Sequence, residues 1–198
     1  MRNLSKLDQM LASLNQKLPA KTPRLEAQSE VNEYESGALM RVNHTGEVAA
    51  QALYHGQAVF ARDPEIKFHL KQAAAEEQAH LEWCEQRTSE LGTHVSRLGP
   101  FWYWGSYSIG LVAGMAGDRW SLGFIKETED QVVEHLQSHL EKLPAEDERS
   151  REIVTNMIKD EARHAADAEL AGAKELPALV KQAMRLSAKV MTSLSYKY

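Results

Sequence analysis

Two short stretches of sequence decide the fold of this chain: EEQAH at residues 76–80 and DEARH at residues 160–164. Each contains a Glu-x-x-His tetrapeptide, and a spacing of three residues brings two side chains onto one face of a helix. One such tetrapeptide is common on helix surfaces. Two of them on two long helices match the way four-helix bundles hold a pair of metal ions, with one further Glu from each remaining helix.

Sequence typical of helices surrounds both stretches. Segments rich in Ala, Leu, Glu and Gln cover residues 37–61 and 64–91, with a break at Asp63-Pro64. The same scheme repeats over 120–143 and 147–175, broken by Leu143-Pro144-Ala145. We expect an all-α protein built from two helical hairpins, without a sheet and without a Gly-rich nucleotide-binding turn.

The positions of the two turns indicate which further carboxylates face the tetrapeptides. If the first hairpin turns near residue 62, the residue level with Glu77 on the preceding helix is Glu47. If the second hairpin turns near residue 145, the residue level with Glu161 is Glu129. At 1.5 Å rise per residue, all four carboxylates lie about 22–24 Å from their turns, so they can share one layer of the bundle.

These residues predict a site for two divalent metal ions. Four carboxylates offset four positive charges, and oxygen donors with only two imidazoles suit iron or manganese. The expected ligands are Glu47 and His80 for one ion, Glu129 and His164 for the other, and Glu77 and Glu161 as bridges. Glu76 and Asp160 are expected in the second shell, each accepting the free N–H of an imidazole from the other hairpin.

Nearby titratable residues are weighed against these. Glu127 lies about 160° around the helix from Glu129, so the two cannot both face the core. His44 is expected to have an outer-shell or solvent role. The other histidines are expected to be ordinary helix or loop residues, with His135 as a candidate proton relay: His55, His69, His94, His135 and His139.

An uncharged segment, FWYWGSYSIGLVAGMAG at residues 101–117, connects the two hairpins. It is shorter and more polar than a membrane-spanning helix, which needs about 20 apolar residues. Gly110 and Gly114 allow close helix contact, either within the chain or between chains. Two interpretations stay open: an apolar buried helix, or a face that meets lipid or a long apolar substrate, helped by its Trp and Tyr residues.

Composition limits the remaining possibilities. The 198 residues are expected to form a single domain, and the net charge of −5 argues against a nucleic-acid partner. The single cysteine, Cys84, excludes a disulfide framework. Residues 1–28 predict an amphipathic helix with leucines three or four apart, followed by a polar linker; the helix would dock on the domain, on a partner or on a membrane surface.

Several motifs together resemble one known family. They are NHTGE at 43–47, EQAH at 77–80, GDRWSLGF at 117–124, ETE at 127–129 and DEARH at 160–164. In this order and spacing the chain resembles the demethoxyubiquinone hydroxylases, di-iron monooxygenases of the ferritin-like superfamily, from about residue 30 to the C-terminus. The Glu-x-x-His pair marks the whole superfamily, and GDRWSLGF narrows the choice to the hydroxylases.

That resemblance implies an oxidoreductase of ubiquinone biosynthesis with two iron ions per subunit. Its substrates are a polyprenyl methoxy-methyl-benzoquinol (demethoxyubiquinol), O2 and an external electron donor, and its product is 3-demethylubiquinol. The resemblance also implies peripheral attachment to the cytoplasmic face of a bacterial inner (cell) membrane, with the mitochondrial inner membrane as the alternative, and contact with other ubiquinone-biosynthesis proteins. The uncharged segment would then admit the polyprenyl tail.

Three other functions compete. A ferritin-like ferroxidase or peroxide-handling protein would use the same ligands, but it has no need of the uncharged segment at 101–117. A manganese catalase is not separated from an iron enzyme by the ligand set alone. A non-enzymatic helical scaffold, with accidental Glu-x-x-His pairs, is disfavoured by the common level of the four carboxylates.

Overall fold

The computed structural model describes residues 33–198, and these residues form helices and loops with no strand. The helices are α2 (Glu33–Phe60), α3 (Pro64–Glu90), α4 (Gly99–Met115), α5 (Asp118–Lys142), α6 (Glu148–Leu170) and α7 (Ala178–Ser195). The prediction of an all-α bundle is confirmed. The amphipathic helix and linker predicted for residues 1–28 lie outside the described residues.

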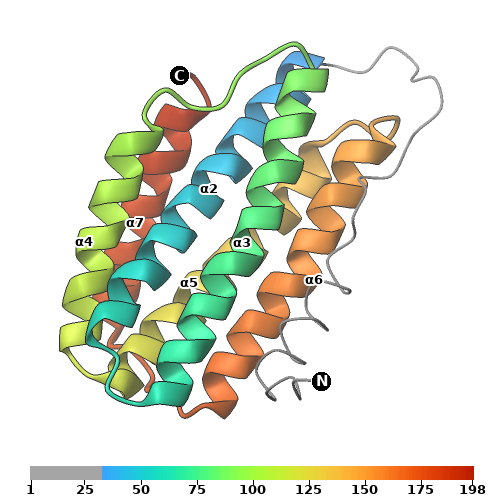
Figure 1. Cartoon of the computed structure of the whole chain (residues 1–198). Helices are drawn as coiled ribbons and strands as arrows, with labels where there is room; N and C mark the ends of the chain where they lie inside the picture. The colour runs from blue at the N-terminus through green and yellow to red at the C-terminus, as the bar shows by residue number, and fades with distance from the viewer. Residues whose placement is uncertain (1–32) are drawn as a thin grey trace, which may run out of the picture.

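Two helical hairpins, α2 with α3 and α5 with α6, form the bundle (Figure 1). Their turns fall between Phe60 and Pro64 and between Lys142 and Glu148, around the positions 62 and 145 expected from the sequence. Asp63 ends the first turn, because its carboxylate accepts a hydrogen bond from the Glu65 amide at 2.8 Å. Each hairpin therefore has the register that the sequence predicts.

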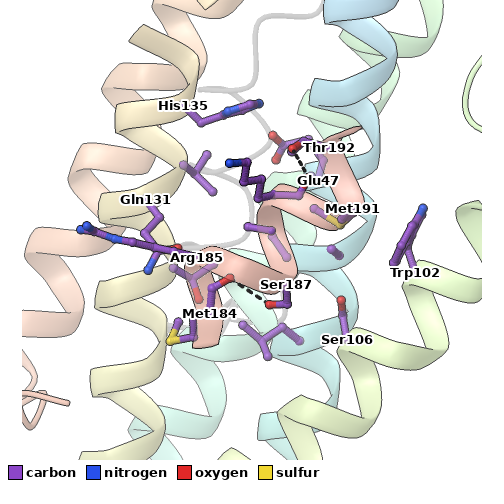
Figure 2. Close-up of a pocket in the computed structure, with 18 of the residues that line it drawn as sticks. Glu47, Trp102, Ser106, Gln131, His135, Met184, Arg185, Ser187, Met191 and Thr192 are labelled. Atoms are coloured by element: carbon purple, nitrogen blue, oxygen red, sulfur yellow. Dashed lines mark hydrogen bonds between the residues drawn. The ribbon is translucent and has the colours of Figure 1, made fainter. Parts of the chain in front are cut away.

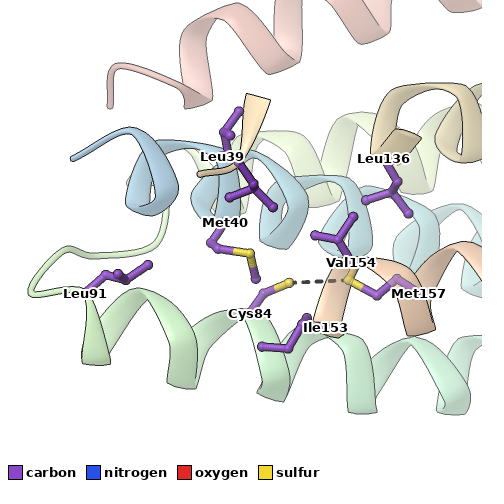
Figure 3. Packing of buried hydrophobic residues seen from close by; sticks show 9 residues of the cluster. Leu39, Met40, Cys84, Leu91, Leu136, Ile153, Val154 and Met157 are labelled. Atoms are coloured by element: carbon purple, nitrogen blue, oxygen red, sulfur yellow. Dashed lines mark hydrogen bonds between the residues drawn. The ribbon is translucent and has the colours of Figure 1, made fainter. Parts of the chain in front are cut away.

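The bundle core consists of two apolar clusters separated along the helix axes. One contains Leu39, Met40, Cys84, Leu91, Leu136, Leu143, Ile153, Val154 and Met157, which Figure 3 shows packed between the helices. The other contains Ala50, Tyr54, Ala58, Leu70, Ala74, Leu122, Ile125 and Ala168. The positions between them along each helix hold the charged residues predicted to bind metal.

Helix α4 lies against α2 through glycines. A Cβ atom on Gly110 would overlap the carbonyl oxygen of Leu53, and one on Gly114 would come within 2.9 Å of the Gln57 carbonyl oxygen. Gly110 and Gly114 therefore serve a contact within the chain. Several large apolar side chains of α4 are exposed: Phe101, Trp104, Ile109, Val112 and Met115. No helix in the described part of the chain is long and apolar enough to cross a membrane.

Helix α7 was not predicted, and the helix predicted over 147–175 ends earlier than expected, at Leu170. The break follows from Gly172, whose φ of +96° leaves the helical region. Helix α7 then runs beside α2 and α5 (Figure 1). Arg41 of α2 holds the C-terminal end of α7 by donating to the carbonyl of Tyr196 at 3.1 Å. Its guanidinium group also donates to the carbonyl of His94 at 2.7 Å.

The GDRWSLGF stretch joins three turns at one end of the bundle. The Asp118 carboxylate accepts hydrogen bonds from the amides of Arg62 and Asp63, at 3.0 and 2.9 Å. The ammonium group of Lys174, in the α6–α7 loop, lies 4.5 Å above the Trp120 ring. This stretch therefore fixes the turn of the first hairpin and the start of α7 to α5.

Candidate metal centre

Six charged residues from four helices meet in one buried layer. Glu47 lies on α2, Glu77 and His80 on α3, Glu129 on α5, and Glu161 and His164 on α6. None of the six is more than 7% exposed. The structure thus brings together all six residues that the sequence singled out.

The six residues form two overlapping groups, each with ligand atoms within 4.8 Å of one another. One group contains Glu47, Glu77, His80 and Glu161, and the other contains Glu77, Glu129, Glu161 and His164. Glu77 and Glu161 belong to both groups. These two carboxylates are therefore the ones that both groups share.

Both imidazoles turn Nδ1 toward the carboxylates of this layer. Nδ1 of His80 lies 3.0 Å from Glu161 and 3.1 Å from Glu77. Nδ1 of His164 lies 3.2 Å from Glu161 and 3.4 Å from Glu77. The two histidines are therefore arranged alike around the shared pair of carboxylates.

The other nitrogen of each imidazole meets a carboxylate from the opposite hairpin. Nε2 of His164 lies 2.8 Å from Glu76, and Nε2 of His80 lies 3.3 Å from Asp160. Arg163 links the two carboxylates through Nη2, at 2.9 Å from Glu76 and 3.3 Å from Asp160. A carboxylate that accepts the Nε2 proton leaves Nδ1 as the free electron-pair donor.

Burial of like charges perturbs the whole layer. Burial and the charge of Glu161 raise the pKa values of Glu47 and Glu129 well above the usual range. Although burial opposes it, hydrogen bonding to Glu161 and Glu76 raises the pKa of His164 to about 12. No N–H group of residues 33–198 donates a hydrogen bond to either carboxylate oxygen of Glu129. Buried carboxylates that repel one another and lack N–H donors fit a pair of cations.

A cavity of about 640 Å³ opens beside this layer, between α2, α4, α5 and α7 (Figure 2). Glu47 lines it, so the cavity reaches the charged layer directly. Its apolar walls include Leu53, Ile109, Val132, Met184 and Met191. A hydrophobic molecule can therefore lie against the carboxylate layer.

Two histidines outside the layer, His135 and His139, lie in contact, and only His135 was singled out from the sequence, as a candidate proton relay. The rings of His135 and His139 lie 4.1 Å apart, and Nδ1 of His139 donates to Oδ1 of Asn43 at 2.7 Å. Burial and the neighbouring His135 lower the pKa of His139 to about 3, so this buried ring is neutral. The i,i+4 spacing of the two histidines was the available signal, together with Asn43 one turn before Glu47.

Other residues considered from the sequence stay apart from the layer. His44 is half-buried and belongs to neither group of ligand atoms. Glu127 is also buried, but its carboxylate faces away from Glu129 and lies 3.0 Å from Lys181 on α7. The carboxylate of Glu127 is covered by Lys181 of α7, a helix that was not predicted.

Comparisons with known proteins identify the family of this chain. The family described as ubiquinone biosynthesis protein COQ7 matches residues 35–195. A 3-demethoxyubiquinol 3-hydroxylase of Nitrosococcus oceani is 51% identical over 98% of both chains, and one of Francisella tularensis subsp. tularensis is 49% identical over the whole of both.

A solved structure supports the fold. The dodecameric thioferritin of Bacteroides fragilis, a bacterioferritin-related protein, matches with a TM-score of 0.56 at 14% identity. The match covers 70% of this chain and 84% of that protein. The family match and the full-length relatives together settle the classification: this chain belongs to the ubiquinone biosynthesis protein COQ7 family.

Proposed function

We propose that this chain is a 3-demethoxyubiquinol 3-hydroxylase, which adds one oxygen atom from O2 to the ring of a polyprenyl methoxy-methyl-benzoquinol and forms 3-demethylubiquinol. The observation that carries this proposal is the apolar cavity whose wall includes Glu47. It allows an apolar ring to approach a layer of carboxylates and imidazoles that fits two metal ions. The full-length relatives named for this reaction support the same conclusion.

We assign two iron ions per chain to the buried layer. Glu47 and His80 would hold one ion, Glu129 and His164 the other, and Glu77 and Glu161 would bridge both. Bound iron supplies the activation of O2 and the redox chemistry of the hydroxylation. The four carboxylates offset the charge of the ions, while Glu76 and Asp160 hold the two imidazoles in the tautomer that leaves Nδ1 free.

The cavity walls hold the substrate and exclude water from the reacting ring. Apolar residues of α4 and α7 can contact the polyprenyl tail, among them Ile109 and Met191. Exposed apolar side chains continue onto the outer face of both helices. On α7 they are Leu179, Leu186, Val190 and Leu194. We assign these faces to peripheral contact with the cytoplasmic side of a cell membrane, where the substrate is dissolved.

The reaction needs partners besides the quinol and O2. One oxygen atom enters the ring and the other leaves as water, so each turnover takes up two electrons and two protons. These electrons come from an external donor. Other ubiquinone-biosynthesis proteins are the natural suppliers and acceptors of such a lipid-soluble substrate.

A ferritin-like ferroxidase is the main competing function. It would use the same six ligands but no organic substrate, so it gives no reason for a cavity of about 640 Å³ with apolar walls. A peroxide-handling manganese protein likewise has no use for a hydrophobic passage. The cavity therefore favours the hydroxylase.

A single turnover tests the proposal. Iron-loaded protein is reduced without air and mixed with ¹⁸O2 and a short-tailed methoxy-methyl-benzoquinol, and products are measured by mass spectrometry. We expect a product heavier by one labelled oxygen, and no such product from Glu161→Ala, which lacks a bridging carboxylate. Oxidation of the iron with unchanged quinol would favour the ferroxidase instead.

A further inference from the structure

Two nitrogens of the cavity wall, one on His135 and one on Trp102, lack a hydrogen-bond partner within residues 33–198. His135 of α5 lines the cavity, and its Nε2 atom is buried with no partner within residues 33–198. Figure 2 shows its side chain reaching from α5. A buried polar atom without a partner destabilises the folded protein by about 1–3 kcal/mol unless a bound molecule supplies the missing bond.

Most other polar side chains around the cavity are already paired within the chain. Thr128, Ser187 and Thr192 donate to main-chain carbonyls of their own helices, and Gln131 donates to Glu127 at 2.7 Å. The amide oxygen of Asn43 accepts from His139. Trp102 of α4 has a second unpartnered atom, Nε1, but an indole nitrogen can only donate. His135 is therefore the cavity side chain with a free and versatile nitrogen.

The imidazole of His135 packs against the ring of His139. Its ring packs 4.1 Å from that of His139, and His139 is fixed by its 2.7 Å hydrogen bond to Asn43. Asn43 precedes Glu47 by one helical turn, and His135 follows Glu129 by six residues, about 9 Å along the axis. The free nitrogen thus sits at a defined place near the charged layer.

We propose that Nε2 of His135 binds one ring oxygen of the quinol and so sets which ring carbon faces Glu47. This inference rests on the proposed hydroxylase function and names a substrate-binding residue for it. A benzoquinol carries two oxygens at opposite ring positions, so one anchored oxygen removes the freedom of the ring to turn within an apolar cavity.

The protonation state of His135 suits both redox forms of the substrate. Burial, followed by the charge of Lys142, lowers its pKa, so the ring is neutral near pH 7. A neutral imidazole has one N–H donor and one acceptor nitrogen. Depending on the tautomer, Nε2 can accept from a quinol hydroxyl or donate to a quinone carbonyl.

Binding measurements without turnover test this inference. The iron-loaded protein is titrated without O2 with the short-tailed quinol and with two analogues, each having a different ring hydroxyl replaced by hydrogen. We expect the wild type to bind one analogue about 10-fold more weakly than the quinol. His135→Leu should bind the quinol about 10-fold more weakly and no longer distinguish it from that analogue.

Two further variants separate binding from folding. His135→Gln places an amide near the same position and should recover part of the preference between quinol and analogue. His69→Gln makes the same substitution at an exposed histidine on α3 and should behave as wild type. Iron content and melting temperature are compared across all variants.

The outcomes are distinguishable. If His135→Leu keeps the wild-type preference, or weakens quinol and analogue equally, the inference is overturned while the hydroxylase function stands. If wild-type protein neither binds nor hydroxylates the quinol, the proposed function itself fails. Loss of the preference in His135→Leu, with partial recovery in His135→Gln, supports the inference.

Discussion

Nε2 of His164 on α6 lies 2.8 Å from the carboxylate of Glu76 on α3, so the second hairpin's imidazole is oriented by the first. The converse pair, His80 with Asp160, is longer at 3.3 Å, and the Asp160 side chain is 36% exposed against 17% for Glu76. Although burial opposes it, hydrogen bonds from His164 and Gln72 lower the pKa of Glu76 to about 2, which keeps it ionised. The two halves of the site are therefore similar but not equivalent.

This asymmetry predicts unequal effects of two substitutions on iron affinity. Glu76→Ala should weaken iron binding by about 10- to 100-fold, because His164 loses the acceptor that fixes its tautomer. Asp160→Ala should weaken it less, since its contact is longer and more exposed. Competition with a calibrated chelator measures both affinities. Equal losses in the two variants would contradict the ranking, and Glu76→Gln serves as the isosteric control.

Metal uptake should release protons. Burial and Glu161 raise the pKa values of Glu47 and Glu129, and hydrogen bonding raises the pKa of His164 to about 12 although burial opposes it, so a metal ion must displace protons from this layer. We expect a net release of protons on loading, and an affinity for Fe²⁺ that rises with pH. Anaerobic calorimetry in buffers of different ionisation enthalpy counts the protons. A binding enthalpy independent of the buffer would rule this out.

The glycine contact between α2 and α4 predicts opposite effects at two positions on one helix. Gly110→Ala should destabilise the protein by about 1–3 kcal/mol, because the new Cβ meets the Leu53 carbonyl oxygen and the helices must move apart. A new Cβ atom at position 105 would have no neighbour within 4 Å, so Gly105→Ala should stabilise the protein by about 0.5–1 kcal/mol through helix propensity. Urea unfolding of both variants gives the comparison. If both substitutions changed the free energy of unfolding in the same direction, the close contact between Gly110 and Leu53 would not be what requires glycine there.

The exposed apolar faces of α4 and α7 predict binding to lipid vesicles. The double variant Leu186→Asp and Val190→Asp should reduce partitioning onto vesicles by about 10-fold, because two apolar side chains no longer enter the bilayer surface. Leu170→Asp changes an 86% exposed leucine at the end of α6 and is the matched control. Flotation assays measure the bound fraction. An equal loss in the control would argue against a specific membrane face.

The charged layer was predictable because local rules determine it. A proline and a capping residue mark each turn, and a constant helical rise then places Glu47 level with Glu77 and Glu129 level with Glu161. The crossed contacts of Glu76 and Asp160 follow from the same register. The level of the four carboxylates needs only one hairpin at a time, and the crossed contacts need only the two hairpins side by side.

The cavity was not predictable in the same way, because it depends on how α4 and α7 lie against the bundle. The apolar row Val180, Met184, Ala188 and Met191 indicates a helix, but not the helices that it faces. Helix α7 supplies the ion pair of Glu127 and one wall of the cavity that His135 lines. The Gly110 and Gly114 spacing predicted a close contact but could not identify its partner.

The charged layer lies on α2, α3, α5 and α6, whereas α4 and α7 carry none of its six residues and contribute to the cavity wall together with α2 and α5. Part of the cavity wall is thereby encoded apart from the charged layer. Evolution, or a protein engineer, can reshape the part of the passage on α4 and α7 for a longer tail or another aromatic ring without changing a single residue of the charged layer.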